Sequence, residues 1–169
     1  MNRTAQTGRV KSERPVTARM RYFLDTEFDG IGGRLISLAL VPEDGGEEYY
    51  AVVAGDADVP WVQRHVMPFL DMVPLALKQP HMTRAEVAHD MARWLANDDR
   101  IEIVADWPED IAQFSMLLIT GPGDMVDIGP VTFRMVRIGG FSCAANSEVP
   151  HNALHDARAL RTHILALEP

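Results

Sequence analysis

The sequence predicts an α/β protein in which a mixed sheet of about five strands is flanked by helices. Two observations carry this prediction. Three short apolar segments near the start are joined by tight turns, which favours antiparallel pairing. Later apolar segments alternate with helical patterns, which is typical of a sheet with helices on its faces. The chain has 169 residues, enough for one domain with a core and too few for two substantial ones.

The early strands are the easiest to outline. The first is expected at residues 22–25, where an apolar run ends in acidic residues. A glycine-rich turn follows, and residues 34–41 are the second expected strand. The segment 44–46, Asp-Gly-Gly, is typical of a hairpin turn and leads to a third strand at residues 48–53.

Helix signals appear in the second half of the chain. Residues 61–70 form the first expected helix, and a second begins at Thr83, which makes a capping box with Glu86. The last helix has Asn152 as its expected N-cap and apolar residues at spacings of three and four. Between them we expect a strand, a helix and a strand, at residues 101–105, 111–118 and 131–138.

Composition restricts the class of protein. Hydrophobic residues make up 47% of the chain, which suits a globular protein rather than a disordered one. No apolar run approaches the roughly 20 residues that span a bilayer, and no secretion signal is recognisable. Cys143 is the only cysteine, so no internal disulfide can form. We therefore expect a cytoplasmic protein without membrane association.

Charge is distributed unevenly. Residues 1–21 contain six cations and one acid, so they carry +5, whereas the whole chain carries −8 and the remainder −13. We expect residues 1–19 to be a flexible basic tail, with a loose nucleic-acid tether as the alternative, and residues 20–169 to be the folded domain. The acidic body is poorly suited to non-specific duplex binding. It is compatible with carboxylates gathered around divalent cations, or simply with a soluble surface.

The first acidic group is Asp25-Thr26-Glu27 at the end of the first strand. Side chains at i and i+2 of a strand point to the same face. Asp25 and Glu27 should therefore lie side by side and repel one another unless a cation lies between them. The simpler alternative is two solvated carboxylates at a strand end.

The second acidic group follows the strand at residues 101–105. Asp106 and Asp110 both lie just beyond the strand's carboxyl end, where open α/β sheets tend to bind ligands. Asp110 should lie near the start of the next helix, where a carboxylate can also simply complement the helix dipole.

The third group combines His151 and Asp156. Asp156 adjoins the apolar face of the last helix, and an inward-facing aspartate needs a partner, which a metal ion would supply. His151 precedes the helix on a loop that can bring its imidazole to the same place. His151 and His155 also form an H-x3-H pair, but a zinc site lacks a convincing third ligand.

Together these groups resemble the DEDDh superfamily of exonucleases, whose pattern is D-x-E on the first strand, an aspartate after the central strand, and H-x4-D on the last helix. Asp25-x-Glu27, Asp110 and His151-x4-Asp156 occur in that order, and the resemblance covers residues 20–168. Small bacterial relatives of RNase T and oligoribonuclease are the most similar. One departure is that a histidine-asparagine pair common before the second aspartate is absent. Asp106 and Asp110 thus compete for that role, and Asp110 is favoured because an apolar helix follows it directly.

The resemblance implies an RNase H-like fold and a 3'→5' exonuclease that releases single nucleotides. Asp25, Glu27, Asp110 and Asp156 would hold two divalent cations, Mg²⁺ or Mn²⁺, because these hard ions prefer carboxylate oxygens. His151 would be the general base.

Further expectations concern the partners. Phe28 would contact the terminal nucleotide, with a core position as the alternative. The implied partner is nucleic acid with a 3' end, RNA being favoured over DNA. Because some relatives are dimers, a homodimer through residues 60–80 is a further expectation.

Three other functions fit parts of the pattern. An exonuclease acting on DNA fits the same residues. A phosphatase with Asp25 as its nucleophile would require a second aspartate two positions on and a supporting lysine. The chain has Glu27 there, and Lys78, the only lysine beyond residue 11, has no suitable neighbours in sequence. A non-catalytic nucleic-acid-binding module of the same fold is disfavoured because all five expected groups are present.

Overall fold

A five-stranded mixed sheet forms the centre of the protein in a computed structural model, which describes residues 19–168. Its strands are β1 (Arg19–Phe28), β2 (Leu35–Pro42), β3 (Tyr49–Val52), β4 (Arg100–Ala105) and β7 (Val131–Met135), in the spatial order β3-β2-β1-β4-β7. The β1–β2 and β2–β3 pairs are antiparallel, whereas β4 is parallel to both β1 and β7. This confirms the predicted α/β class with helices flanking the sheet, and the arrangement is consistent with an RNase H-like fold.

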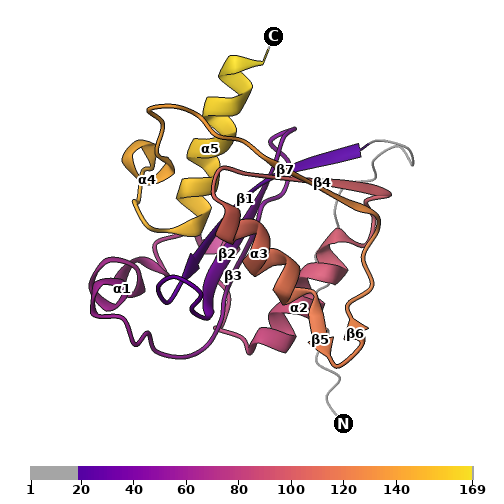
Figure 1. Cartoon of the computed structure of the whole chain (residues 1–169), viewed down its shortest axis with the longest axis horizontal. Helices are drawn as coiled ribbons and strands as arrows, with labels where there is room; N and C mark the ends of the chain where they lie inside the picture. The colour runs from indigo at the N-terminus through magenta and orange to yellow at the C-terminus, as the bar shows by residue number, and fades with distance from the viewer. Residues whose placement is uncertain (1–18, 169) are drawn as a thin grey trace.

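Helices cover both faces of the sheet. They are α1 (Pro60–His65), α2 (Arg84–Leu95), α3 (Pro108–Leu117), α4 (Cys143–Asn146) and α5 (Ala153–Leu167), with short 3-10 turns η1 (Met67–Phe69) and η2 (Leu75–Leu77). A small hairpin is formed by β5 (Ile119–Gly121) and β6 (Asp124–Met125). Figure 1 shows α5 on one side of the central strands and the α2–α3 pair on the other.

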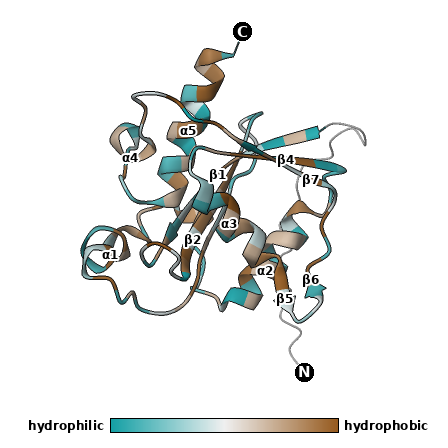
Figure 2. Cartoon of the chain, viewed as in Figure 1, coloured by the Kyte–Doolittle hydropathy of each residue, from teal (hydrophilic) through white to brown (hydrophobic). Residues whose placement is uncertain are grey.

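The alternation of side chains along β1 builds two apolar cores. Tyr22 and Leu24 pack with residues of α2 and α3, whereas Phe23, on the opposite face, packs with residues of α5. All three are completely buried, and the central strands are correspondingly apolar (Figure 2). Because β1 is buried on both faces, the acids at its end are placed by a rigid interior strand.

Several expected boundaries shift. The capping box of Thr83 and Glu86 and the N-cap of Asn152 are confirmed, but the expected helix at 61–70 is divided into α1 and η1. Helix α3 begins at Pro108, earlier than expected, because proline is well tolerated in the first turn. Strand β1 begins at Arg19, so this residue does not belong to a flexible tail; the rest of the expected tail lies outside the described residues. Within the described residues, no helix has the length and apolar character needed to cross a bilayer.

The topology places the site. Because β1 and β4 run parallel, with Phe23 beside Val104, their carboxyl ends emerge at the same edge of the sheet. Helix α5 packs against β1 and β2, and its far end is tied to β1 by Arg21, which donates to both Glu168 oxygens at 2.7 and 2.5 Å. The start of α5 therefore lies near the strand ends that carry the acidic groups.

Candidate active site

The end of β1 presents acids on one face and a hydroxyl on the other. Asp25 and Glu27 follow Phe23 on the face covered by α5, as the i, i+2 rule predicts. Asp25 is buried and Glu27 is partly buried. Thr26 lies on the opposite face, where it reaches α3.

The carboxylate of Asp110 is fixed by Thr26. Its Oδ1 accepts hydrogen bonds from the Thr26 backbone N at 3.1 Å and from Thr26 Oγ1 at 2.6 Å, and the side chain is buried. Asp106 lines the same cavity, and its Oδ2 accepts from Cys143 Sγ at 3.3 Å. The structure thus brings both acids of the second group to the site, and the choice of Asp110 as the ligand stays a prediction.

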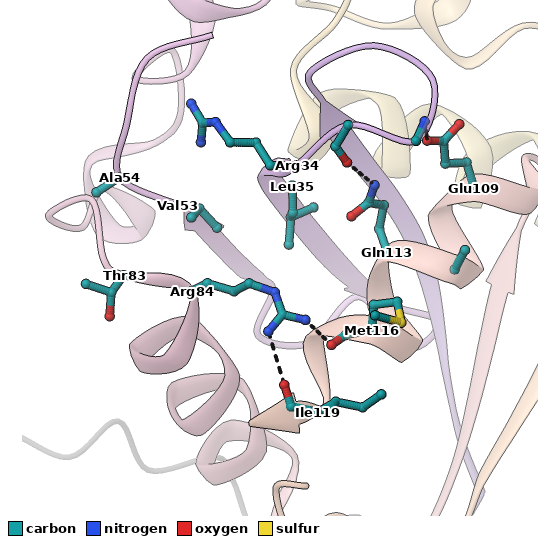
Figure 3. Close-up of a pocket in the computed structure, with 13 residues that line it drawn as sticks. Arg34, Leu35, Val53, Ala54, Thr83, Arg84, Glu109, Gln113, Met116 and Ile119 are labelled. Carbon is teal, nitrogen blue, oxygen red and sulfur yellow. Dashed lines mark hydrogen bonds between the residues drawn. The ribbon is translucent and has the colours of Figure 1, made fainter. Parts of the chain in front are cut away.

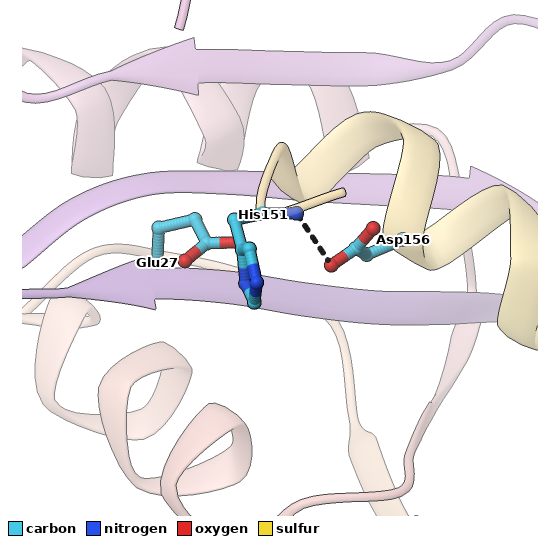
Figure 4. A group of neighbouring side chains, drawn as sticks. All are labelled: Glu27, His151 and Asp156. Carbon is cyan, nitrogen blue, oxygen red and sulfur yellow. Dashed lines mark hydrogen bonds between the residues drawn. The ribbon is translucent and has the colours of Figure 1, made fainter. Parts of the chain in front are cut away.

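The start of α5 supplies the third group. Asp156 is buried, and its Oδ2 accepts from the backbone N of His151 at 3.3 Å. One donor atom from each of Glu27, His151 and Asp156 lies within 4.8 Å of the others. Figure 4 shows the Glu27 carboxylate beside the His151 ring, with Asp156 projecting from α5. Glu27 comes from β1, so residues separated by more than a hundred positions meet here.

These groups line one open cavity of about 710 Å³. All five residues predicted as catalytic line it, and so does Phe28, the predicted nucleotide contact. Its rim also carries aromatic side chains: Trp61 from α1, Trp107 beside Asp106, and Phe141 from the segment before α4. Trp107 is 50% exposed, so its ring is accessible to a ligand. Trp61 is 46% exposed, but His65 stacks on its ring and His151 contacts it edge-on. The cavity combines a carboxylate floor with an aromatic rim.

Burial, followed by mutual repulsion, raises the pKa values of the acids. Burial is the main cause for each of them. It raises the pKa of Asp25 well above its usual range, with Asp110 the strongest charged neighbour and Glu27 the next. Burial with the charge of Asp156 raises the pKa of Glu27 to about 8. Burial likewise raises the pKa of Asp110 to about 7, although its bonds from Thr26 oppose the change, and that of Asp156 to about 6.

His151 is held in an uncommon backbone conformation. Its φ is 62°, a left-handed value that costs non-glycine residues about 1–3 kcal/mol and is concentrated at functional sites. Its ring contacts Trp61 edge-on at 4.9 Å between centroids, and Trp61 stacks on His65. Partial burial, with the nearby His65, lowers the pKa of His151, which favours the neutral imidazole that can accept a proton.

His155 does not join the site. The ring is buried, its Nε2 lies 2.9 Å from the carbonyl of Met72, and its Nδ1 lies 3.5 Å from Glu148. It is absent from the cavity lining. The H-x3-H pair of His151 and His155 therefore does not converge on a zinc ion.

The donor set fits a hard divalent cation. Asp156 Oδ1 is buried and makes no hydrogen bond of good geometry among the described residues, although the Ser147 hydroxyl is close enough to oppose the rise in pKa that burial causes in this carboxyl. Such an oxygen can ligate an ion. Among the described residues, the donor atoms within 4.8 Å of one another are those of Glu27, His151 and Asp156. Asp25 and Asp110 line the same cavity and add carboxylate oxygens, the type that Mg²⁺ and Mn²⁺ prefer. A bound cation would also relieve the repulsion that raises these pKa values.

The sequence did not point to three residues of this cavity. Thr26 occupies the variable position of the D-x-E pattern, so nothing in the sequence indicated that it would bind Asp110. Trp61 had only a helical context, and Arg137 lies in a segment without periodicity that leads from β7 to α4. Loop residues reach a site through tertiary structure, which one sequence does not reveal.

The raised pKa values predict how stability depends on pH. Because these carboxyls bind protons more tightly when folded than when unfolded, the folded protein holds more protons between about pH 4 and pH 8. Their contribution to the free energy of unfolding therefore decreases as pH rises through this window in the absence of metal. Mg²⁺ or Mn²⁺ at about 100 times its Kd should restore about 2.7 kcal/mol, which raises Tm by roughly 5–10 °C. Melting curves with EDTA and with metal should show a larger metal-induced shift at pH 8 than at pH 5.

Glu27→Gln is the matched variant for this measurement. It keeps the shape of the side chain but removes one titrating ligand, so both the pH dependence and the metal-induced shift should shrink. Equal shifts at both pH values, or an undiminished shift in Glu27→Gln, would contradict the assignment of these carboxyls to a cation site.

Comparisons with known proteins do not identify the chain. No model of a known protein family matches the sequence, and no curated protein matches it. The resemblance to the DEDDh exonucleases consequently depends on the three groups of residues described above.

Proposed function

We propose that the protein is a metal-dependent 3'→5' exonuclease that removes single nucleotides from RNA. One observation carries the proposal: Asp25, Glu27, Asp110, Asp156 and His151 line one cavity, although they come from three separate parts of the chain. The 3'→5' direction and the preference for RNA follow from the resemblance to DEDDh exonucleases.

Four carboxylates at one site are consistent with phosphodiester hydrolysis. Asp25, Glu27, Asp110 and Asp156 would hold two divalent cations between them. Bound Mg²⁺ or Mn²⁺ would lower the pKa of the attacking water and neutralise charge that develops on the phosphate. Thr26 orients Asp110 through its two hydrogen bonds and is a positioning residue in this scheme.

His151 is the proposed general base. Its ring lies beside Glu27 and Asp156 and can take a proton from the attacking water. The left-handed backbone at His151 directs the ring into the cavity, while the chain enters α5 at Asn152. A lowered pKa keeps the imidazole neutral over a wider pH range.

The rim suits a single-stranded end. Phe28, Trp61 and Trp107 line the cavity, and unpaired bases are commonly held by aromatic side chains. Arg137 is an exposed cation on the same rim and can contact a phosphate. These contacts would place the terminal nucleotide over the carboxylates.

Hydrolysis of a 5'-labelled single-stranded RNA is the direct test. With Mg²⁺ or Mn²⁺ we expect a ladder of products, each one nucleotide shorter at the 3' end, and with excess EDTA we expect none. A substrate blocked at its 3' end should resist. The same sequence as DNA should be cleaved more slowly.

The outcomes separate the alternatives. Faster cleavage of DNA would favour the DNA exonuclease. Metal-dependent binding without cleavage of either polymer would favour the non-catalytic module. Undiminished cleavage in EDTA would contradict the metal-dependent mechanism.

A further inference from the structure

A second cavity adjoins the candidate active site. Its volume is about 730 Å³, and Glu109 lines both cavities. The loop between β1 and β2 divides them: Gly30 and Ile31 line the first, whereas Gly32 lines the second. Glu109 Oε1 accepts from the Gly32 backbone N at 2.7 Å, which joins α3 to this loop (Figure 3). The two cavities therefore lie on either side of this loop.

Two arginines give the second cavity a positive character. Arg34 donates to the carbonyl of Asp56, and Arg84 donates to those of Met116 and Ile119. Both arginines are solvent-accessible, and neither forms an ion pair with a carboxylate within residues 19–168. A guanidinium has five N–H donors, so carbonyl contacts leave donors for an anion. Hydrogen bonds from the Asp58 and Val59 backbone, and then the charge of Arg34, lower the pKa of Asp29 on the β1–β2 loop. A positive cavity stands out in a chain whose net charge is −8.

The remaining walls are largely apolar. Leu35 and Val53 lie on the sheet side, and Met116 and Ile119 lie at the end of α3 and in β5. Met116 and Ile119 are 56% and 45% exposed, so they present apolar surface to solvent. Positive groups in a groove suit the phosphate backbone of a single strand. The apolar walls can contact its bases, without the aromatic side chains that line the first cavity. Among the described residues that line this cavity, Glu109 is the only acid, and it is already bonded to the loop.

We propose that this cavity binds the nucleotides upstream of the scissile bond, with Arg34 and Arg84 contacting their phosphates. The inference rests on the proposed function, and it specifies the substrate class as single-stranded chains of several nucleotides rather than dinucleotides. The occupant is the 5' part of the same strand whose 3' end lies at the carboxylates. The position of the two cavities on either side of Glu109 and the charge of the arginines favour this occupant.

Arg34→Ala is the informative variant, because the hydrogen bond that Arg34 donates to the carbonyl of Asp56 lies at the surface. We expect kcat/KM of the wild type to be higher on a hexanucleotide than on a dinucleotide. Arg34→Ala should lower kcat/KM on the hexanucleotide by roughly 10-fold, as for the loss of a charged hydrogen bond, and should affect the dinucleotide much less. The logarithmic salt dependence of hexanucleotide binding should also become shallower, by about 0.7 for each phosphate that is no longer neutralised.

Arg93→Ala is the matched control. Arg93 is an exposed cation of α2 that pairs with Asp90 and lines neither cavity, so its loss should leave the length dependence unchanged. Arg84→Lys, which keeps the charge, should retain more of the length dependence than Arg84→Ala. Melting curves would show whether Arg84→Ala, which removes bonds to the end of α3, is still folded.

Binding of the labelled hexanucleotide in EDTA, followed by fluorescence anisotropy, separates this inference from the proposed function. If the protein hydrolyses RNA but Arg34→Ala lowers kcat/KM equally on the hexanucleotide and the dinucleotide, the upstream site is wrong and the proposed exonuclease activity is not affected. If the protein binds the hexanucleotide through Arg34 but does not hydrolyse it, the proposed exonuclease activity is wrong and the cavity is a strand-binding site. If Arg34→Ala weakens binding of a free mononucleotide but not of the hexanucleotide, the cavity serves a nucleotide ligand, and the inference is wrong.

Discussion

Replacing Asp25 with Asn is expected to abolish turnover while the protein stays folded. Asp25 is buried at the end of an interior strand, and its pKa is raised by burial and then by Asp110 and Glu27. Asparagine has nearly the same shape but cannot balance the charge of a cation. Since a bound metal contributes several kcal/mol to transition-state stabilisation, and each 1.36 kcal/mol is tenfold in rate, kcat should fall by roughly 10³-fold or more.

The same substitution, which lowers turnover, should raise the stability of the metal-free protein. Removing one of several mutually repelling carboxyls relieves an unfavourable interaction, so Asp25→Asn should melt at a higher temperature than the wild type in EDTA at pH 8. It should also lose most of the stabilisation by Mn²⁺. Rates on labelled RNA and melting curves with and without Mn²⁺ measure both effects.

Asp71→Asn provides the control, because Asp71 is an exposed aspartate that pairs weakly with Lys78 at 3.7 Å and does not line the cavity. It should resemble the wild type in rate and in response to metal. Substantial turnover by Asp25→Asn would show that the carboxylate cluster is not the catalytic centre.

The sequence predicted the direction of a site side chain where the period of a strand or helix alone determines it. Asp25 and Glu27 share a face because of the two-residue period of a strand, and both line the cavity. Asp156 faces inward because it borders the apolar stripe of α5. Each of these inferences required only the local period and the apolar pattern.

Features that depend on contacts between distant segments could not be predicted. Asp106 and Asp110 both reach the cavity, and what distinguishes them is the pair of bonds from Thr26 to Asp110, which links residues 84 positions apart. The second cavity likewise depends on how α2, α3 and the β1–β2 loop pack together. One sequence contains no direct signal for such pairings.

In the fold, too, elements with a local sequence signal were predicted and elements that depend on tertiary contacts were not. The apolar runs of β1, β2 and β4 and the caps of α2 and α5 could be predicted because each carries a local signal. The β5–β6 hairpin and α4 were missed because they are short and their exposed residues show no amphipathic period. Short elements of this kind are stabilised mainly by their tertiary surroundings.

The second large effect is expected for His151→Ala, which should lower kcat much more than it weakens substrate binding. A positioned general base contributes about 10²–10⁴-fold to rate, whereas the carboxylates and the aromatic rim that hold the substrate would remain. The His151 backbone N, rather than its ring, donates to Asp156, so the substitution should leave that contact in place. Measuring kcat together with Kd for a non-hydrolysable oligonucleotide separates the two effects.

The pH profile adds a second readout. Protonation of the imidazole removes the base, so wild-type activity should decline on the acid side, below about pH 6.5, because burial lowers the pKa of His151. With saturating metal, which lowers the pKa values of the carboxyls that hold it, the slow His151→Ala variant should lose that limb of the profile. If the variant keeps the limb, the titrating group belongs elsewhere in the site.

His155→Gln is the control, which tests whether turnover depends on the second histidine near the start of α5. His155 is buried and lies 2.9 Å from the carbonyl of Met72 through its Nε2, and a glutamine amide can donate to the same carbonyl. This variant should therefore fold and turn over nearly as the wild type, since the ring does not line the cavity. Because His151 precedes α5 with a left-handed backbone whereas His155 lies in the first turn of the helix, the comparison tests which of the two side chains serves the site. If His155→Gln lost turnover while His151→Ala kept it, His155 rather than His151 would be the general base. The H-x4-D assignment of His151 and Asp156 would then be wrong.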